Sequence, residues 1–522
     1  MLRRAANPRG PPHVSPLMRS AEEDPSHPHG APPPAEEAGA PHPPAQAPEA
    51  DDADDAGDLA AGRGFWRSVW EALTGSHQDY TRGSLGRSIL LLAVPMVLEM
   101  SMESVFAVVD VFFVARLGAD AVATVGLTEG VLTLVYAVAI GLAMSTTAMV
   151  ARRVGERDER GAAVAAAQAI WLGLAVSAVV AVVGLFFARD LLRLMGGSPE
   201  LVAAGWGYPA VIFSTSAVIV LLFLNNAIFR GAGDAAIAMR ALWLANLINL
   251  ALDPCLIFGL GPFPELGLTG AAVATAIGRG TGVVFQLWVL FSRQGRIKLS
   301  AAGMRFDRAV TLRLVRLSIG GVVQFLIATA SWLGLVRILA LFGSAALAGY
   351  TIAIRIIVFA ILPSWGLGNA AATLVGQSLG AGKPERAERA VWRSGFYNMI
   401  FLTAVGFVFV ALARPLVGLF TADQEVTAVA ATCLRVVSVG YPVYAWGMVM
   451  VQAFNGAGDT YTPTWINLGC YWLFQIPLAY GLARMTDLEE NGVFIAILAA
   501  ETLLTAVTIL VFRRGRWKLR QV

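Results

Sequence analysis

The apolar residues of this chain gather into stretches of about 20 residues separated by short polar segments, the length a helix needs to cross a bilayer. The first three stretches run from 88 to 113, from 126 to 150 and from 162 to 187. Of the 522 residues, 56% are hydrophobic and 14% are charged, against about 25% charged in an ordinary soluble domain. The pattern therefore predicts an all-α integral membrane protein.

Further stretches bring the number of predicted spans to twelve. They lie at 207–229, 237–259, 268–292, 314–341, 346–375, 392–412, 428–454, 463–482 and 493–512. Most Lys and Arg residues fall in connections on one side, so the positive-inside rule predicts that both termini are cytoplasmic. We therefore expect a multi-pass protein of the cell inner membrane. The net charge of +3 reflects this topology and does not indicate nucleic-acid binding.

Composition divides the chain into six segments. Residues 1–62 are rich in Pro, Ala and acidic residues and are expected to be a disordered tail. In residues 63–80, Phe65, Trp66 and Trp70 share one helical face, which predicts an amphipathic helix in the membrane interface. The other segments are an amino-terminal lobe at 81–293, a cytoplasmic linker at 294–313, a carboxy-terminal lobe at 314–512 and a basic cytoplasmic tail at 513–522.

An internal repeat indicates that the two lobes are homologous. Residues 229–234 read Phe-Arg-Gly-Ala-Gly-Asp, and residues 454–459 read Phe-Asn-Gly-Ala-Gly-Asp. Gly118 and Gly155 likewise have counterparts 225 residues later, at Gly343 and Gly380. Because six spans separate the copies, the halves keep one orientation and are related by an axis along the membrane normal. In transporters of this architecture the substrate binds between the halves.

Several motifs resemble those of the multidrug and toxic compound extrusion (MATE) family, over nearly all of the chain from 88 to 512. They are Val-Asp-Val-Phe-Phe-Val at 109–114, Arg-Gly-Ala-Gly-Asp at 230–234, Asn-Leu-Ala-Leu-Asp-Pro at 249–254 and Gly-Ala-Ala-Val-Ala-Thr at 270–275. The resemblance implies a V-shaped pair of six-helix lobes. It also implies secondary active export of amphiphilic, often cationic drugs or toxins in exchange for inward flow of H⁺ or Na⁺.

Three carboxylates form an acidic stripe on the first span. On a helical wheel, Glu103 and Asp110 lie about 40° and about 20° from Glu99. A charge at the bilayer centre costs a few kcal/mol, so an ionisable residue there marks a functional site by default. Asp110 is the strongest candidate, whereas Glu99 lies near the cytoplasmic end, where simple solvation is an equal alternative.

A polar cluster on the fifth span provides partners for these acids. Asn246, Asn249 and Asp253 are spaced by three and four residues and share a helical face. Pro254 follows and removes the hydrogen bond to the Leu250 carbonyl, which predicts a kink with a free acceptor. Carboxylate, amide and carbonyl oxygens together can hold Na⁺ or a proton. The family resemblance implies that the cation site consists of Asp110, Asn249, Asp253 and Thr275, and we add Asn246 and Glu103 as coupling residues.

The substrate cleft and a gate are also predicted. Thioether, aromatic and polar side chains suit promiscuous binding of apolar cations. The predicted cleft residues are Glu99, Met100, Tyr136, Gln324, Trp332 and Tyr350. Glu129 and Arg355 occupy nearly equivalent positions in the second and eighth spans, so we expect them to pair across the lobes when the outside is closed. Pairing of each residue within its own lobe is the alternative.

The carboxy-terminal half lacks the acids of its partner. The seventh span offers Gln324 and Arg337, and the eleventh has Asn467 and Gln475, with no counterpart of Asp253. A second acidic cation site is therefore not expected there. Glu501 is the one deep acid in this half, and a helix-packing hydrogen bond is favoured over an ion site.

The sequence supports other functions less well. Residues 376–384 lack the first glycine and the final Ser or Thr of a phosphate-binding loop. The spans contain no His pair, zinc motif or Ser or Cys beside a base, so we expect no enzymatic activity and no cofactor. A lipid-linked oligosaccharide flippase of the same superfamily is the main competitor, and a strongly cationic cleft would favour it. The expected partners of a monomer are amphiphilic small molecules and membrane lipids.

Overall fold

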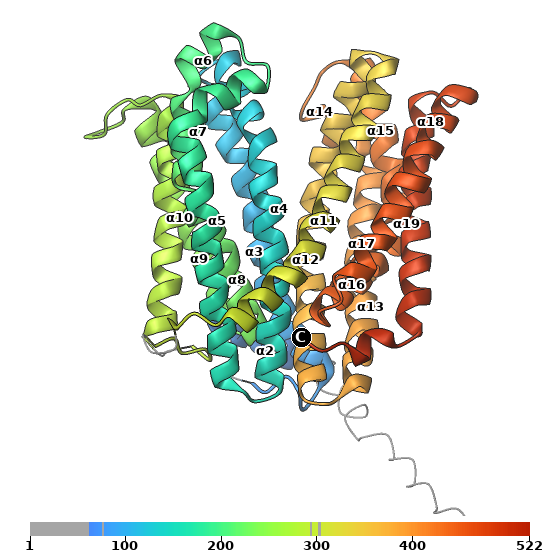
Figure 1. Ribbon diagram of the computed structural model, residues 1–522. Helices are drawn as coiled ribbons and strands as arrows, with labels where there is room; N and C mark the ends of the chain where they lie inside the picture. The colour runs from blue at the N-terminus through green and yellow to red at the C-terminus, as the bar shows by residue number, and fades with distance from the viewer. Residues whose placement is uncertain (1–61, 76–77, 293–294, 301–303) are drawn as a thin grey trace, which may run out of the picture. The chain divides into compact units, whose positions relative to one another are not determined.

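The computed structural model describes residues 62–75, 78–292, 295–300 and 304–522. Apart from Gly62, the predicted disordered tail lies outside the described residues. The described part of the chain contains helices and connecting loops and no strand, as predicted (Figure 1).

Six helical rods form each lobe. The amino-terminal lobe contains α3 (Leu85–Ala115), α4 (Ala119–Gly155), α5 (Glu159–Leu194), α7 (Gly207–Ser214) with α8 (Ser216–Ala232), α9 (Ala235–Phe258) and α10 (Leu268–Phe291). The carboxy-terminal lobe contains α11 (Arg308–Leu339), α12 (Ser344–Gly380), α13 (Pro384–Ala411), α15 (Gln424–Val439) with α16 (Tyr441–Gly456), α17 (Tyr461–Asn467) with η3 (Leu468–Gln475) and α18 (Ile476–Met485), and α19 (Glu490–Arg513). Shorter helices are α2 (Gly62–Thr74), α6 (Pro199–Gly205), η2 (Ala340–Phe342), α14 (Ala413–Gly418) and η4 (Arg516–Leu519).

Each predicted span falls on one of these rods. Among the described residues, nine helices are long and apolar enough to cross a membrane, or up to eleven if each bent pair is one span. The remaining rod runs without a gap from α17 to α18, and its middle part, η3, is a π-helix. The bends are 43° between α7 and α8 and 61° between α15 and α16. They fall at Thr215 and Gly440, which are 225 residues apart, so the bend is part of the repeat.

Close contacts between α4 and α12 show the pseudo-symmetry at atomic detail. A Cβ atom added at Gly155 would lie 2.1 Å from the carbonyl oxygen of Gln377. One added at Gly380 would lie 2.1 Å from the carbonyl oxygen of Arg152. Both the glycines and their contact residues are 225 positions apart, so these contacts are copies of each other. The axis relating the lobes therefore passes between the ends of α4 and α12.

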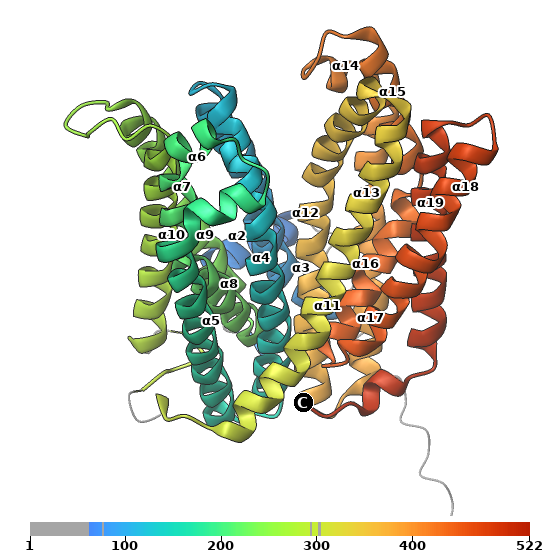
Figure 2. The same cartoon turned by 45° about the horizontal axis from the view of Figure 1, so that its top comes forward.

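One end of the bundles collects several chain segments, and we call it the α2 face. It holds α2, the turns after α4 and α12, and the carboxyl terminus (Figures 1 and 2). On α2, Trp66 and Trp70 are 71% and 69% exposed, whereas Ala72 is buried against the core. This amphipathic exposure fits the predicted interfacial helix, which stays a prediction because the structure contains no membrane.

The described parts of the linker and of the carboxy-terminal tail contain more helix than predicted. The first helix of the carboxy-terminal lobe begins at Arg308, not at 314, because the carboxylate of Asp307 accepts from the backbone N–H groups of Ala309 and Val310. The tail contains η4, with Trp517 buried, and is held by an ion pair of 3.2 Å between Arg520 and Asp459. The tail therefore packs against the helices in addition to carrying positive charge.

Candidate functional site

A cavity of about 390 Å³ lies between the lobes, and we call it the inter-lobe cavity. Its lining from the amino-terminal lobe includes Glu99, Met100, Glu103, Tyr136, Arg230 and Arg279. Its lining from the carboxy-terminal lobe includes Phe325, Trp365, Asn369, Gln452 and Asn455. Apolar walls with a few polar side chains are typical of a small-molecule site.

Two ion pairs set the electrostatics of this cavity. The Glu99 side chain has no exposed surface, and one carboxylate oxygen lies 3.3 Å from Arg230 and accepts from the Asn226 amide at 2.9 Å. Glu103 pairs with Arg279 at 3.2 Å. The acidic stripe therefore does not give this cavity wall a net negative charge, because Glu99 and Glu103 each pair with an arginine. Solvation of Glu99 at the membrane edge is wrong, since the residue is fully buried.

Sequence reasoning missed both arginines, although a signal existed for one. Arg279 lies near the middle of the predicted sixth span, and the rule that singled out the acids applies equally to a basic residue. Arg230 falls just after the predicted fourth span, inside the motif that identified the internal repeat. In the structure Arg230 lies in the last turn of α8 and is 8% exposed.

The predicted cation-site residues meet inside the amino-terminal lobe. The Asn249 amide donates to the Asp253 carboxylate at 3.0 Å and accepts from the Thr275 hydroxyl at 3.1 Å. Asp253 has no exposed surface, and Asp110 on α3 lies near enough for the two carboxylates to repel each other. Three helices, α3, α9 and α10, thus contribute to one polar cluster, which we call the acid cluster.

Small residues on α10 allow this approach. A Cβ atom at Gly278 would lie 2.6 Å from the carbonyl oxygen of Ala245 and 2.8 Å from the Asn249 side chain. At Gly270, an added Cβ would lie 2.3 Å from the carbonyl oxygen of Leu256. Glycine at both positions lets α10 pack directly on the α9 backbone, which brings Thr275 to Asn249.

The two added coupling residues lie between the acid cluster and the inter-lobe cavity. Asn246 donates to Glu103 at 3.4 Å, one turn of α9 away from Asn249. Glu103 in turn pairs with Arg279 on the cavity wall. A path of polar side chains on α9 therefore runs from the cluster to Glu103 at the cavity wall, although no hydrogen bond joins Asn246 to Asn249 or Asp253 among the described residues. At Pro254 the helix continues to Phe258, so α9 is not interrupted there, although the Leu250 carbonyl lacks its usual donor.

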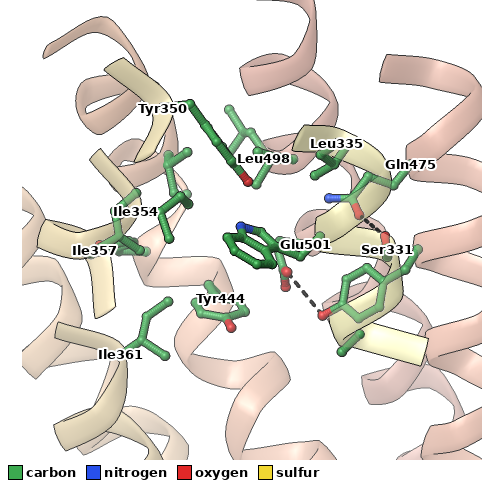
Figure 3. Close-up of a pocket in the computed structure, with 17 residues that line it drawn as sticks. Ser331, Leu335, Tyr350, Ile354, Ile357, Ile361, Tyr444, Gln475, Leu498 and Glu501 are labelled. Atoms are coloured by element: carbon green, nitrogen blue, oxygen red, sulfur yellow. Dashed lines mark hydrogen bonds between the residues drawn. The ribbon is translucent and has the colours of Figure 1, made fainter. Parts of the chain in front are cut away.

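Three predicted cleft residues do not line the inter-lobe cavity. Trp332 and Tyr350 line a cavity inside the carboxy-terminal lobe (Figure 3), and Gln324 lines a small one next to it. Tyr350 is only 1% exposed and stacks on Phe494 of α19. Apolar residues cover every face of these spans, so the sequence pattern did not reveal which side of α11 or α12 faces the partner lobe.

The predicted gate residues belong to different lobes and lie near each other without an ion pair. Arg355 of α12 is close enough to act electrostatically on Glu129 of α4. No ion pair within 4 Å joins these two described residues. Their pairing in another state of the protein stays a prediction.

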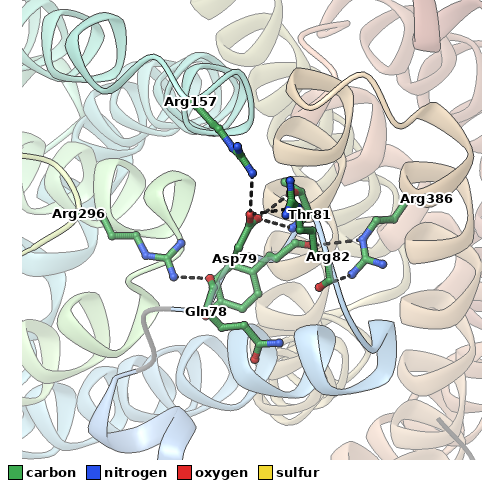
Figure 4. A network of polar contacts seen from close by, with 8 residues as sticks. Gln78, Asp79, Thr81, Arg82, Arg157, Arg296 and Arg386 are labelled. Atoms are coloured by element: carbon green, nitrogen blue, oxygen red, sulfur yellow. Dashed lines mark hydrogen bonds and ion pairs between the residues drawn. The ribbon is translucent and has the colours of Figure 1, made fainter. Parts of the chain in front are cut away.

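A strap formed by residues 78–82 crosses the α2 face between the lobes (Figure 4). Three arginines from different parts of the chain hold it: Arg157 after α4, Arg296 in the linker and Arg386 on α13. Arg157 pairs with Asp79 at 3.6 Å, and the other two donate to strap carbonyls. The strap therefore links the amino-terminal lobe, the linker and the carboxy-terminal lobe.

Comparison with known proteins agrees with this architecture. The MatE family model matches residues 95–255 and 321–481, and the two matches begin 226 residues apart, close to the offset of the internal repeat. A probable multidrug resistance protein of Bacillus subtilis, YoeA, is 25% identical over 85% of this chain and 97% of that protein. An FAD transporter of Shewanella oneidensis is 26% identical over 76% of this chain and 87% of that protein.

A solved structure gives the same result for the fold. It is described as the outward-facing conformation of a multidrug resistance MATE family transporter of the MOP superfamily. The two chains are 26% identical and superpose with a TM-score of 0.80. The match covers 85% of this chain and 98% of the solved one. The predicted fold class, an all-α membrane protein of two six-helix lobes with a cleft between them, is confirmed.

Proposed function

This chain belongs to the MatE family of membrane transporters, and we propose that it exports amphiphilic compounds, cations among them, in exchange for H⁺ or Na⁺. The multidrug resistance names of the relative YoeA and of the similar solved structure support drug export. The acid cluster is the observation that carries the exchange mechanism. Asp110 and Asp253 lie together in a membrane-spanning lobe, where two uncompensated carboxylates would be costly. A bound proton or Na⁺ removes that cost.

The polar path from the acid cluster to the cavity supplies the coupling. Asp253, Asn249 and Asn246 follow one another on α9, so a rearrangement on cation binding at Asp253 is transmitted along the helix to Asn246. Asn246 contacts Glu103, whose partner Arg279 lines the inter-lobe cavity. Cation binding thereby alters the cavity wall, and drug and cation compete for the amino-terminal lobe.

The orientation in the membrane follows from charge and contacts. The α2 face carries Arg82 of the strap, Arg157 in the turn after α4 and Lys383 in the turn after α12, which supports placing it in the cytoplasm. The direct contacts of Gly155 and Gly380 close the lobes at this face. We therefore assign the structure to a state closed toward the cytoplasm, in the inner membrane, with a monomer as the transporting unit.

An anionic substrate is the second candidate. The relative from Shewanella oneidensis is named an FAD transporter, and both FAD and a lipid-linked oligosaccharide carry phosphates. Arg230 and Arg279 could bind phosphate, which favours this reading. Both arginines are already paired with glutamates, however, so the cavity offers no free cation from this pair and a neutral or cationic amphiphile fits better.

The test uses purified full-length protein in proteoliposomes loaded with a fluorescent cationic dye. Dye efflux is measured under a pH gradient alone, under a Na⁺ gradient alone and with neither. We expect one gradient to drive efflux above the rate without a gradient. Parallel vesicles loaded with FAD should show no gradient-driven efflux. Efflux of FAD but not dye would reject the proposed substrate class, and efflux of neither would reject exchange transport.

A further inference from the structure

A cavity of about 190 Å³ lies inside the carboxy-terminal lobe, apart from the acid cluster (Figure 3). We call it the aromatic cavity, because its lining includes Trp332, Tyr350, Tyr441, Tyr444 and Tyr471. Aliphatic side chains from α11, α12 and α19 complete the wall. The function proposed above does not use this cavity, since its coupling residues all belong to the other lobe.

The cavity contains one carboxylate, Glu501 of α19. One of its oxygens accepts a hydrogen bond from the Tyr471 hydroxyl at 3.1 Å (Figure 3). The other oxygen is buried and has no hydrogen-bond partner among the described residues. No described Arg or Lys neutralises it, in contrast to Glu99 and Glu103, which each pair with an arginine. The predicted packing hydrogen bond is thus present but satisfies only half of the carboxylate.

The chemistry of the walls favours an organic cation over an inorganic one. Hard inorganic cations are held by several carboxylate and carbonyl oxygens. The Gln475 amide oxygen on the cavity wall already accepts from Ser331 at 3.0 Å, and the remaining lining is mainly aromatic and aliphatic. Aromatic faces around one carboxylate are the arrangement that recognises alkylammonium groups.

A third cavity lies between this cavity and the inter-lobe cavity. This third cavity, of about 190 Å³, shares Phe325, Trp365 and Gln452 with the inter-lobe cavity. The same third cavity shares Tyr444 and Tyr471 with the aromatic cavity. The three spaces are therefore neighbours with shared walls, and a ligand that enters between the lobes would reach Glu501 only by displacing the side chains of Tyr444 and Tyr471.

We propose that the aromatic cavity binds a compact organic ammonium cation, with Glu501 as its counter-charge and the surrounding tyrosines and Trp332 as its aromatic cage. A cavity of about 190 Å³ suits compact cations such as choline or tetraethylammonium. The site goes beyond the proposed function because it places a second ligand in the lobe that lacks the coupling acids.

Equilibrium binding of radiolabelled tetraethylammonium to the full-length protein in nanodiscs tests the proposal. We expect saturable binding, weakened at least about tenfold in Glu501→Gln, because loss of the only counter-charge removes the main attraction. Glu490→Gln changes an acid in the first turn of the same helix and is the matched control, expected to bind like the wild type. Binding that is unchanged in Glu501→Gln, or lost only in Asp253→Asn, would overturn the proposal.

Two further measurements distinguish a specific cation site from a folding defect and from nonspecific hydrophobic binding. Glu501→Asp keeps the charge and should retain binding within a few-fold, even if Glu501→Gln is poorly folded. Choline should displace tetraethylammonium, whereas its neutral isostere 3,3-dimethyl-1-butanol should not. Equal displacement by both, or full displacement by millimolar Na⁺, would contradict an organic-cation site. Because the assay needs no ion gradient, failure of the transport mechanism would leave its result unaffected.

Discussion

At the level of single residues, paired charges dominate the inter-lobe cavity. Glu103 and Arg279 come from α3 and α10 and meet at 3.2 Å, with the arginine side chain only 6% exposed. Removing one member of such a pair leaves the other uncompensated, whereas removing both leaves a neutral wall. The pair thus ties two helices of the amino-terminal lobe together beside the inter-lobe cavity.

This pairing predicts a rescue between two substitutions. Arg279→Gln should lower the melting temperature of the purified protein by roughly 5 °C or more, because Glu103 loses its partner in a low-dielectric setting. The double variant with Glu103→Gln should recover much of the loss. Arg193→Gln breaks an exposed ion pair with Asp190 and serves as the control, with little expected change. Equal melting of the single and double variants would argue against a coupled pair.

Among the elements, the strap at 78–82 has a pH-dependent attachment. Partial burial acts to raise the pKa of Asp79, but hydrogen bonds from Thr81 and the charges of Arg157 and Arg82 outweigh it and hold the pKa below its usual value. A lowered pKa in the folded state stabilises the strap above the ordinary aspartate pKa of about 4. This contribution is lost as the pH falls through the lowered value.

Hydrogen exchange of the strap amides measures that attachment. At pH 7, Asp79→Asn should lower the protection factors of the strap amides. These amides should therefore exchange faster than in the wild type after correction for intrinsic exchange rates. The two proteins should converge only as the pH falls below about 4 and through the lowered pKa of Asp79, because the wild-type carboxylate becomes protonated there. A difference that persists unchanged into acid would show that the Asp79 charge does not hold the strap.

The α4–α12 contact is the second element with a sharp prediction. Gly155→Ala and Gly380→Ala each insert a methyl group where a backbone carbonyl lies 2.1 Å away, so the helices must separate. Both variants should be destabilised by about 1–3 kcal/mol, and by similar amounts, because the contacts are symmetric copies. Gly126→Ala lies in the same helix with nothing within 4 Å and should be neutral or stabilising. Thermal unfolding of the four proteins compares them directly.

Elements were easier to predict than the faces of elements. The length of the apolar stretches predicted all twelve spans, and the 225-residue repeat predicted the two lobes. Helical spacing also placed Asn249 and Asp253 on one face, because their distance depends on α9 alone. Trp332 and Tyr350 were assigned to the wrong cavity because a membrane helix is apolar all round and its inward face is not marked. The ion pair between Glu103 and Arg279 joins two helices, and a pattern within one helix does not reveal such a pair.

For the whole molecule, two homologous lobes carry different chemistry. The amino-terminal lobe holds the acid cluster and both glutamate–arginine pairs, whereas the carboxy-terminal lobe holds one unpaired carboxylate in an aromatic cavity. Both lobes share the same helix order and the same bends at Thr215 and Gly440. Energy coupling is therefore expected to reside in one lobe, although both lobes line the inter-lobe cavity.

Gradient-driven dye efflux from proteoliposomes containing Asp110→Asn or Asp253→Asn tests this account most directly. The exposed residue Asp190 provides the control variant Asp190→Asn. The account predicts that both cluster variants lose gradient-driven efflux while the control keeps the wild-type rate, because amides cannot exchange a proton or supply the charge that holds Na⁺. Wild-type efflux rates in Asp110→Asn and Asp253→Asn would contradict it.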